Sequence, residues 1–337
     1  MFPNSVGMSY GFKEEGYKSF VDFVNERCEA VIIPFANTLR LDPKHDARGK
    51  SAAHSVRQFK VPVIPFGLGA QAPTMDVDAA DFGPGMIEFI RTLCDACPAV
   101  SVRGEFTNAL FDKYGSTENV HVTGCPSFFS RPEVFAELKT KLDREEPVER
   151  AAFSGSLHHE KDPRKQLNNS IEQGMHLIEP VNAHLHRYYV EVLSGNENAK
   201  VPYFLATLLE SPDWNRKRLA DYIVSRYHLF RDLDSWIAFN REALDGVIGT
   251  RFHVSMAGLL SAIRPVWITH DSRTVELCER LSLPSVNVAE SLEKPYRAIL
   301  EEADYSAMYS NLESNFEDFN TFLDAAGLPR IASPALE

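Results

Sequence analysis

Residues 245–271 read DGVIGTRFHVSMAGLLSAIRPVWITHD. The apolar run at 246–249 predicts a buried strand, the stretch from Phe252 to Ile263 predicts a helix, and the run at 265–269 predicts a second strand. Strands that alternate with helices in this way are typical of parallel βαβ units. The stretch therefore predicts an α/β fold whose parallel sheet resembles that of a Rossmann domain.

Three polar side chains lie at the turn between the first of these strands and the helix. Thr250, Arg251 and His253 follow the strand directly, so we expect them at the carboxyl edge of the sheet and at the N-terminus of the helix. A helix N-terminus favours an anion, and the planar guanidinium of an arginine suits phosphate or carboxylate. A histidine can give or take a proton near neutral pH. The turn is a candidate site for an anionic ligand, although a helix start with a salt bridge would also explain these residues.

The same alternation extends on both sides of this stretch. The N-terminal half predicts strands near 30–34, 61–66, 99–102 and 120–122, and the second half predicts two more near 150–154 and 285–288. The segment 139–150 is rich in charged residues, separates the two halves and predicts a domain boundary. We expect an N-terminal Rossmann-like domain at 1–142, a C-terminal one at 150–290, and helices at 291–337 that pack across both.

Charge and hydropathy narrow the range of functions. The chain has 337 residues and a formal net charge of −12. This charge disfavours a nucleic-acid partner, because neutralising phosphates requires a basic face. The apolar runs are too short to span a bilayer, and residues 1–4 lack the basic and apolar regions of a secretory leader. We expect a cytoplasmic protein without a membrane span, and the sequence leaves peripheral membrane contact open.

Cysteine and acidic patterns give no sign of a metal. The five cysteines are scattered, and the pair Cys94 and Cys97 has no second pair at ligand spacing. Asp76 and Asp78 resemble the D-x-D of metal-dependent glycosyltransferases, but they lie among Ala and Asp in a predicted loop and fit a solvated turn. We therefore expect neither a bound metal nor an organic cofactor.

Further candidate residues follow the other predicted strands. Each of them also fits an ordinary structural role: an ion pair between Arg103 and Glu105, a tight turn, or a polar loop. The candidates are Asn37 after the first strand, Gly67 and Gly69 after the second, Arg103 after the third, His158 in the second half, and His270 and Asp271 after the strand at 265–269.

Together these motifs resemble the polysaccharide pyruvyl transferase family. That family is similar in having a strand that leads into Arg-x-His at the start of a small-residue helix, followed by a Pro-led strand and then an Asp. The matching residues here are Gly249-Thr-Arg-Phe-His253, Arg264-Pro-Val-Trp-Ile268 and His270-Asp271, with Ser101-Val-Arg103 and Gly124-Cys-Pro126 in the first half. The resemblance covers most of the chain from about residue 30, including the closing Tyr- and Phe-rich helices. It departs at Met1–Tyr10, which is too short for the family's opening strand and loop, so either the N-terminal domain is abbreviated or residues are absent from this chain.

The resemblance implies two Rossmann-like domains that face a cleft, as in GT-B glycosyltransferases. It implies transfer of a pyruvyl group from phosphoenolpyruvate, as co-substrate, onto sugar hydroxyls of an exopolysaccharide or its lipid-linked precursor. By the same resemblance, His253 would be the general acid, and Arg103 and Arg251 would bind the donor's phosphate and carboxylate. Thr250, His270 and Asp271 would line the donor side, and the acceptor side would include Asn37, Gly67, Gly69 and His158.

Two other functions fit the same residues. A GT-B glycosyltransferase that uses a nucleotide sugar would share the architecture, with Glu276 or Glu279 holding the ribose. A non-catalytic relative could bind a sugar or an anion without turnover. The sequence does not specify the acceptor sugar, the choice between ketal and enol-ether product, or the oligomeric state.

Overall fold

The computed structural model describes residues 16–155 and 161–336. The chain divides into two compact units. Unit 1 comprises residues 1–132, 271–283 and 306–333, and unit 2 comprises residues 133–270, 284–305 and 334–337. The chain enters unit 2 at Glu133, ahead of the charged segment at 139–150, and two later segments return to unit 1. The division into folding domains at 1–142, 150–290 and 291–337 stays a prediction, since the units group residues by compactness alone.

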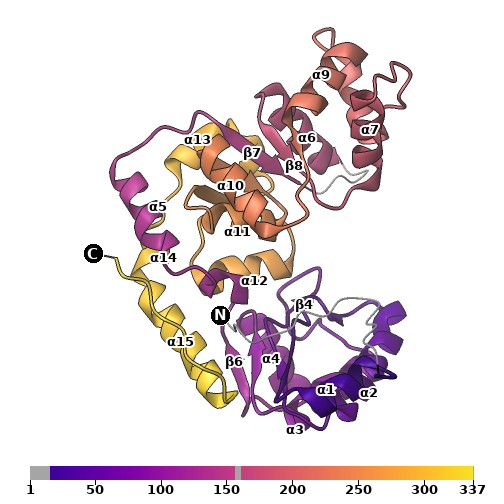
Figure 1. Ribbon diagram of the computed structural model, residues 1–337, viewed down its shortest axis with the longest axis vertical. Helices are drawn as coiled ribbons and strands as arrows, with labels where there is room; N and C mark the ends of the chain where they lie inside the picture. The colour runs from indigo at the N-terminus through magenta and orange to yellow at the C-terminus, as the bar shows by residue number, and fades with distance from the viewer. Residues whose placement is uncertain (1–15, 156–160, 337) are drawn as a thin grey trace. The chain divides into compact units, whose positions relative to one another are not determined.

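Unit 2 is built on a six-stranded sheet in which all neighbours are parallel. The strand order is β12-β11-β10-β7-β8-β9. The sheet confirms the predicted α/β class, and the strand, helix and strand of residues 245–271 are present as β10, α11 and β11 (Figure 1). The strands are β7 (Ala151–Ser154), β8 (His176–Ile178), β9 (Tyr227–His228), β10 (Gly246–Gly249), β11 (Arg264–Thr269) and β12 (Ser285–Asn287).

The helices of unit 2 supply the apolar side chains that bury this sheet. Phe153, Ile248 and Val266 from the strands share one core with Tyr296 and Leu300, and the rings of Phe153 and Tyr296 stack at 5.3 Å. The helices are α5 (Val134–Asp143), α6 (Lys161–Glu172), α7 (Ala183–Leu193), α8 (Tyr203–Ala206), α9 (Arg216–Arg226), α10 (Leu233–Ala243), α11 (Phe252–Leu259) and α13 (Tyr296–Glu302), with 3₁₀ segments η3 (Thr207–Glu210) and η4 (Glu290–Leu292).

Unit 1 also contains only parallel strand pairs among its described residues. β1 pairs with β3, β5 pairs with β6, and a parallel bridge between Leu68 and Val102 links the two pairs. A further short pair is formed by β2, which follows β1 in the chain, and β4, which follows β3. The strands are β1 (Val31–Ile33), β2 (Leu39–Arg40), β3 (Val63–Pro65), β4 (Ala70–Gln71), β5 (Val100–Val102) and β6 (Val120–Val122).

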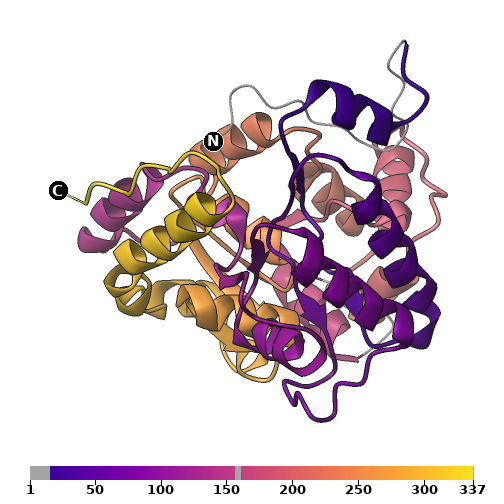
Figure 2. The ribbon, with the colours of Figure 1, turned by 90° about the horizontal axis from the view of Figure 1, so that it is seen from below.

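Helices from three separate parts of the sequence complete unit 1. α2 and α3 lie side by side (Figures 1 and 2), and α15 contributes an aromatic cluster in which Phe319 stacks on Phe129 at 4.2 Å and Phe322 contacts Phe66. The helices are α1 (Phe20–Arg27), α2 (Asp46–Gln58), α3 (Pro84–Ala96), α4 (Glu105–Tyr114), α12 (Ser272–Leu281), α14 (Ser306–Ser310) and α15 (Leu312–Ala325), with 3₁₀ segments η1 (Pro43–His45) and η2 (Pro126–Phe129).

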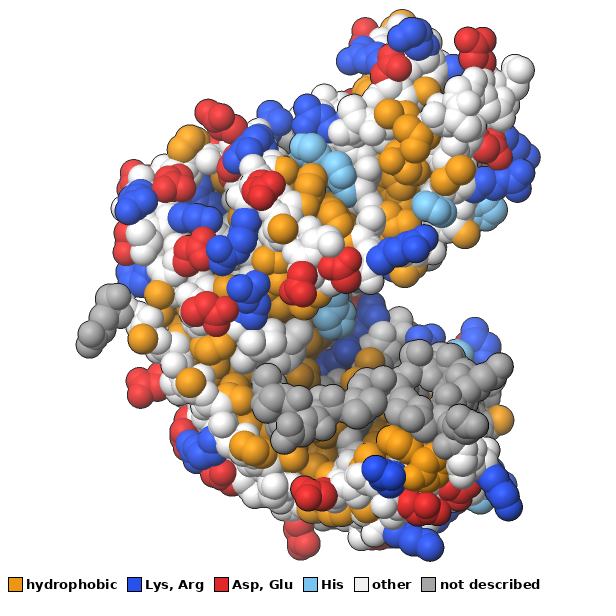
Figure 3. Space-filling view, viewed as in Figure 1, with side chains coloured by type: hydrophobic (Ala, Val, Ile, Leu, Met, Phe, Trp, Pro, Cys, Tyr) orange, Lys and Arg blue, Asp and Glu red, His pale blue; other side chains and the backbone are white. Residues whose placement is uncertain are grey.

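The surface carries charges of both signs. On the face shown in Figure 3, Lys and Arg side chains are interspersed with Asp and Glu side chains. That face therefore has no continuous basic area of the kind that nucleic acid requires. Within the described part of the chain, no helix combines the length and the apolar character that a membrane span needs.

Candidate functional site

The turn between β10 and α11 is held tightly against strand β7. A Cβ atom on Gly249 would lie 1.8 Å from the carbonyl oxygen of Ser154, so only glycine allows the two strand ends to approach this closely. The backbone N–H of Thr250 donates to the same carbonyl at 2.8 Å. Arg251 is then the N-cap residue of α11, and His253 is an exposed residue of its first turn. The carboxyl end of β10 therefore places Thr250, Arg251 and His253 at one helix start, as predicted.

Arg251 is fixed by a buried carboxylate that sequence reasoning missed. Its Nε and one terminal nitrogen donate to the two carboxylate oxygens of Glu179, at 3.2 and 3.1 Å. Glu179 is fully buried just after β8, and one of its oxygens also accepts from the backbone N–H of Val181 at 2.9 Å. Burial raises the pKa of Glu179, and the charge of Arg251 acts in the opposite direction. These two hydrogen bonds to Glu179 leave the second terminal nitrogen of Arg251 available to another partner.

One sequence signal could have pointed to Glu179. It directly follows the apolar strand His176–Ile178, so it leaves the sheet at the same carboxyl edge as Thr250. An acidic residue at the end of a parallel strand is well placed to meet a basic residue at the end of a nearby strand. The order of the strands, which puts β7 between β8 and β10, is not legible in the sequence.

The unit 1 candidates come together around Arg103. Its Nε donates to the carbonyl of Gly67 at 2.9 Å, and a terminal nitrogen donates to the side-chain oxygen of Asn37 at 2.5 Å. Gly69 makes room for this side chain, because a Cβ there would lie 2.5 Å from Cδ of Arg103. Arg103 is only 4% exposed, and burial lowers the pKa of its guanidinium. The loops after β1, β3 and β5 thus converge on one buried arginine.

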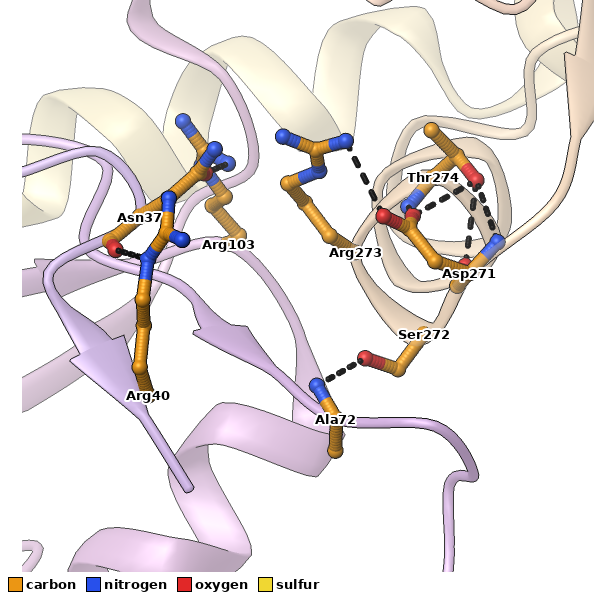
Figure 4. A network of polar contacts seen from close by, with 8 residues as sticks. All are labelled: Asn37, Arg40, Ala72, Arg103, Asp271, Ser272, Arg273 and Thr274. Atoms are coloured by element: carbon orange, nitrogen blue, oxygen red, sulfur yellow. Dashed lines mark hydrogen bonds and ion pairs between the residues drawn. The ribbon is translucent and has the colours of Figure 1, made fainter. Parts of the chain in front are cut away.

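Two arginines not anticipated from the sequence join Arg103. Arg40 donates from Nε to the carbonyl of Asn37 at 3.2 Å, so Asn37 contacts both Arg40 and Arg103. Arg273 lies on the other side of Arg103 in Figure 4, and its charge adds to burial in lowering the pKa of Arg103. Figure 4 shows the three side chains with Arg273 between Arg103 and Asp271. We call Arg40, Arg103 and Arg273 the arginine cluster.

The arginine cluster has donors to spare. Arg273 pairs with Asp271 at 3.0 Å, but its Nε is buried without a partner in the described residues. The two terminal nitrogens of Arg40 likewise make no hydrogen bond within the described part of unit 1. Asp271 is the single carboxylate paired with the cluster among the residues that the structure describes. The cluster is therefore net positive and suited to an anion.

Asp271 has a structural role, and its expected contact with the donor stays a prediction. One of its carboxylate oxygens accepts from the backbone N–H of Thr274 at 2.9 Å and caps α12, while the other pairs with Arg273. His270 is exposed after β11 and is the last residue of its unit 2 segment, whereas Asp271 begins a unit 1 segment. His158 lies outside the described residues.

Glu276 accepts hydrogen bonds from the first turn of α4. Its two carboxylate oxygens accept from the backbone N–H of Thr107 at 2.7 Å and from the Thr107 hydroxyl at 3.0 Å. The side chain is 2% exposed, and burial raises its pKa to about 7. Both oxygens are therefore engaged within unit 1, and a ribose contact of Glu276 stays a prediction. Glu279 on the same helix is exposed.

No cluster of metal ligands accompanies these residues. In residues 16–155 and 161–336, no group of three or more His, Cys, Asp and Glu side chains could hold a metal ion. The candidate residues instead form two groups, one in each unit: an arginine and a histidine at the start of α11, and the arginine cluster. Arginine side chains are suited to binding anions, and a histidine can transfer a proton.

Comparisons with known proteins give one family and a distant structural likeness. A family model described as polysaccharide pyruvyl transferase matches residues 5–272. No curated protein matches the chain. A structure described as a UDP-N-acetylglucosamine 2-epimerase from Listeria monocytogenes is similar with 12% identity and a TM-score of 0.40, covering 88% of this chain and 77% of that one. A UDP-GlcNAc 2-epimerase from Methanocaldococcus jannaschii, in complex with UDP-GlcNAc and UDP, gives 12% identity, a TM-score of 0.41, and coverage of 84% and 72%.

Proposed function

The chain belongs to the polysaccharide pyruvyl transferase family, and from this premise we propose that it moves a pyruvyl group from phosphoenolpyruvate onto hydroxyls of a saccharide. The family match over residues 5–272 is the observation that carries the proposal. The arginine and histidine at the start of α11 support it, because the donor has two anionic groups and needs a proton. No metal is part of the proposal.

In this reaction His253 protonates the methylene carbon of phosphoenolpyruvate. The neighbouring carbon becomes electrophilic, a sugar hydroxyl adds to it, and the bond to the phosphate oxygen breaks. When a second hydroxyl adds to the same carbon, a ketal forms. Of the two hydroxyl protons, one replaces the proton that His253 gave to the methylene carbon, and the other leaves with phosphate. A general acid of this kind contributes roughly 10²- to 10⁴-fold to the rate.

Arg251 binds the donor and holds the phosphate as negative charge moves onto it. Its fork to Glu179 fixes the direction of the guanidinium before the donor arrives, so little rotamer entropy is lost on binding. Arg103 is the second donor-binding arginine of the proposal, as the family resemblance implies. Its buried position among other arginines supports a contact with an anion rather than with solvent.

The test is phosphate release from phosphoenolpyruvate by the full chain, with and without a panel of saccharides. We expect release that depends on both the donor and a saccharide, and a pyruvylated sugar visible by mass spectrometry. A thermal-shift screen separates the alternatives: phosphoenolpyruvate should raise the melting temperature, whereas UDP-sugars should not. Stabilisation by UDP-sugars alone, or by neither ligand together with no phosphate release, would contradict the proposal.

A further inference from the structure

A pocket of about 770 Å³ opens in unit 1 beside the arginine cluster. This volume lies in the range of roughly 300–1,000 Å³ that small-molecule sites occupy. Arg40 and Asp271 belong both to the pocket wall and to the network of Figure 4. The rest of the wall comes from residues 41–42, η1, β4 and the loop at 72–80. The pocket thus shares Arg40 and Asp271 with the predicted anion site and extends beyond it.

Arg40 and Gln71 are direct partners across the parallel pair of β2 and β4. Both line the pocket. The side-chain oxygen of Gln71 is buried without a hydrogen-bond partner in the described residues, and the terminal nitrogens of Arg40 have none there either. A buried, unpaired acceptor costs about 1–3 kcal/mol. The donor, Arg40, and the acceptor, Gln71, are neighbours but do not pair with each other. A ligand group that both donates and accepts could bind them together, and a hydroxyl is such a group.

The remaining wall disfavours a strongly anionic occupant. Asp42 and Lys44 pair with each other at 2.5 Å, so their charges offset one another. Asp76 accepts from the backbone N–H groups of Asp78 and Ala79 at 2.9 and 3.3 Å and remains an acidic wall residue. A phosphate in the pocket would face the carboxylate of Asp76. A neutral polyol would find both donors and acceptors.

We infer that this pocket binds the saccharide acceptor, with one sugar hydroxyl donating to the Gln71 side-chain oxygen and accepting from Arg40. The inference rests on the proposed function for the identity of the acceptor. Asn37 links the pocket to the anion site, since it contacts Arg40 through its carbonyl and Arg103 through its side chain. The acceptor hydroxyls would therefore lie next to the arginine cluster within unit 1.

Hydrogen exchange with the full chain tests the inference without any turnover. The probes are the methyl glycosides of glucose, galactose and mannose, each at high millimolar concentration, and inorganic phosphate. We expect at least one glycoside to slow exchange in peptides that cover 39–45 and 70–80. The arginine cluster, which includes Arg40, is itself suited to phosphate, so the control is the peptide that covers 70–80, which phosphate should leave unchanged.

Two substitutions make the test specific. Gln71→Leu keeps the size of the side chain and removes the acceptor, so the apparent dissociation constant of the glycoside should rise by about 2- to 12-fold. Gln58→Leu is the matched control, because Gln58 is exposed on α2 and does not line the pocket. Circular dichroism and the melting temperature check that both variants fold.

The outcomes separate the inference from the proposed function. Protection of the two peptides that Gln71→Leu weakens and Gln58→Leu retains supports the inference, even if phosphoenolpyruvate proves not to be the donor. No protection by any glycoside, or protection by phosphate alone, overturns the inference, even if the chain releases phosphate from phosphoenolpyruvate. Equal protection in both variants also overturns it, because the sugar would then bind without Gln71.

Discussion

Glu179 grips Arg251 through both carboxylate oxygens, at 3.1 and 3.2 Å, from a position with no solvent exposure. The arginine itself remains 31% exposed. A buried carboxylate thus holds the near side of the guanidinium, and the outer side is left for a ligand. The two hydrogen bonds to Glu179 fix the orientation of the Arg251 guanidinium and keep it paired with a charge. The donor-binding role that we propose for Arg251 therefore depends on Glu179.

Glu179→Gln should weaken donor binding although Glu179 need not touch the donor. The amide keeps one hydrogen bond but loses the charge and the second acceptor, so Arg251 becomes less well oriented. We expect a loss of about 0.5–3 kcal/mol in donor affinity, the range for residues coupled in one network. Isothermal titration with phosphoenolpyruvate measures it. Glu172→Gln, an exposed change on α6, serves as the control, and equal affinities for both variants would contradict the positioning role.

Arg251→Ala should lose a contact that is already made in the ground state. Donor affinity should fall by about 1.5–3 kcal/mol, the value of a hydrogen bond to a charged group. Turnover should fall too if Arg251 holds the departing phosphate. The substitution also leaves Glu179 buried and unpaired, so the melting temperature must be measured alongside binding. A folded variant that binds phosphoenolpyruvate normally would exclude Arg251 from the donor site.

His253→Ala should separate chemistry from binding. The variant lacks the proton donor used in the transition state, so turnover should fall by roughly 10² to 10⁴ while donor affinity changes little. His186→Ala on α7 is the matched control, since both histidines are exposed on helices of unit 2. Near-normal turnover with a confirmed acceptor would show that another group supplies the proton.

Gly69→Ala should act through Arg103. The added methyl would lie 2.5 Å from Cδ of Arg103 and would push the side chain away from Gly67 and Asn37. We expect a stability loss of about 1–3 kcal/mol from overpacking, and the same loss of donor affinity as in Arg103→Ala. The double variant decides whether the two are coupled: its donor affinity should match that of Arg103→Ala alone, whereas additive losses would show that Gly69 acts elsewhere.

Glu276 should make the stability of unit 1 dependent on pH. Its folded pKa of about 7 lies above the ordinary value of 4.5, so the folded state binds the extra proton between these two values. Its contribution to stability is therefore complete below about pH 4.5 and is lost as the pH rises through 7. Glu276→Gln should flatten the difference in unfolding free energy between pH 5 and pH 8, by on the order of a few kcal/mol. Glu279→Gln on the same helix should retain the wild-type slope, and a variant Glu276→Gln with that same slope would contradict the prediction.

Local sequence patterns were sufficient to predict the strands named below and the strand-to-helix turn at Arg251. The apolar runs at 246–249 and 265–269 are confirmed as β10 and β11, and those at 30–34, 61–66, 99–102 and 120–122 contain β1, β3, β5 and β6. Strand ends that carry Asn37, Gly67 and Arg103 were also legible, because the carboxyl ends of parallel strands share one edge.

Side-chain contacts between residues far apart in the sequence could not be predicted. Glu179 meets Arg251 only because the strand order places β8 near β10, and Arg273 meets Arg103 only because α12 packs in unit 1. For Asp271 the position after a strand predicts a ligand contact, but it gives no sign that the carboxylate caps α12 and pairs with Arg273. Strand order and the docking of helices depend on the whole core, which a local pattern cannot encode.

The return of the chain to unit 1 after residue 305 has a consequence for biosynthesis. The ribosome makes β7 to β12 before it makes α15, so the whole sheet of unit 2 is available for folding while unit 1 still lacks Phe316, Phe319 and Phe322. Until those rings arrive, Phe66 and Phe129 have no aromatic partners from α15 on the nascent chain. The aromatic contacts of Phe66 and Phe129 with α15 can therefore form only after the sheet of unit 2 has been made, although the synthesis of unit 1 begins first. During that interval the rings of Phe66 and Phe129 lack this cover, and transiently exposed apolar surface of this kind favours aggregation.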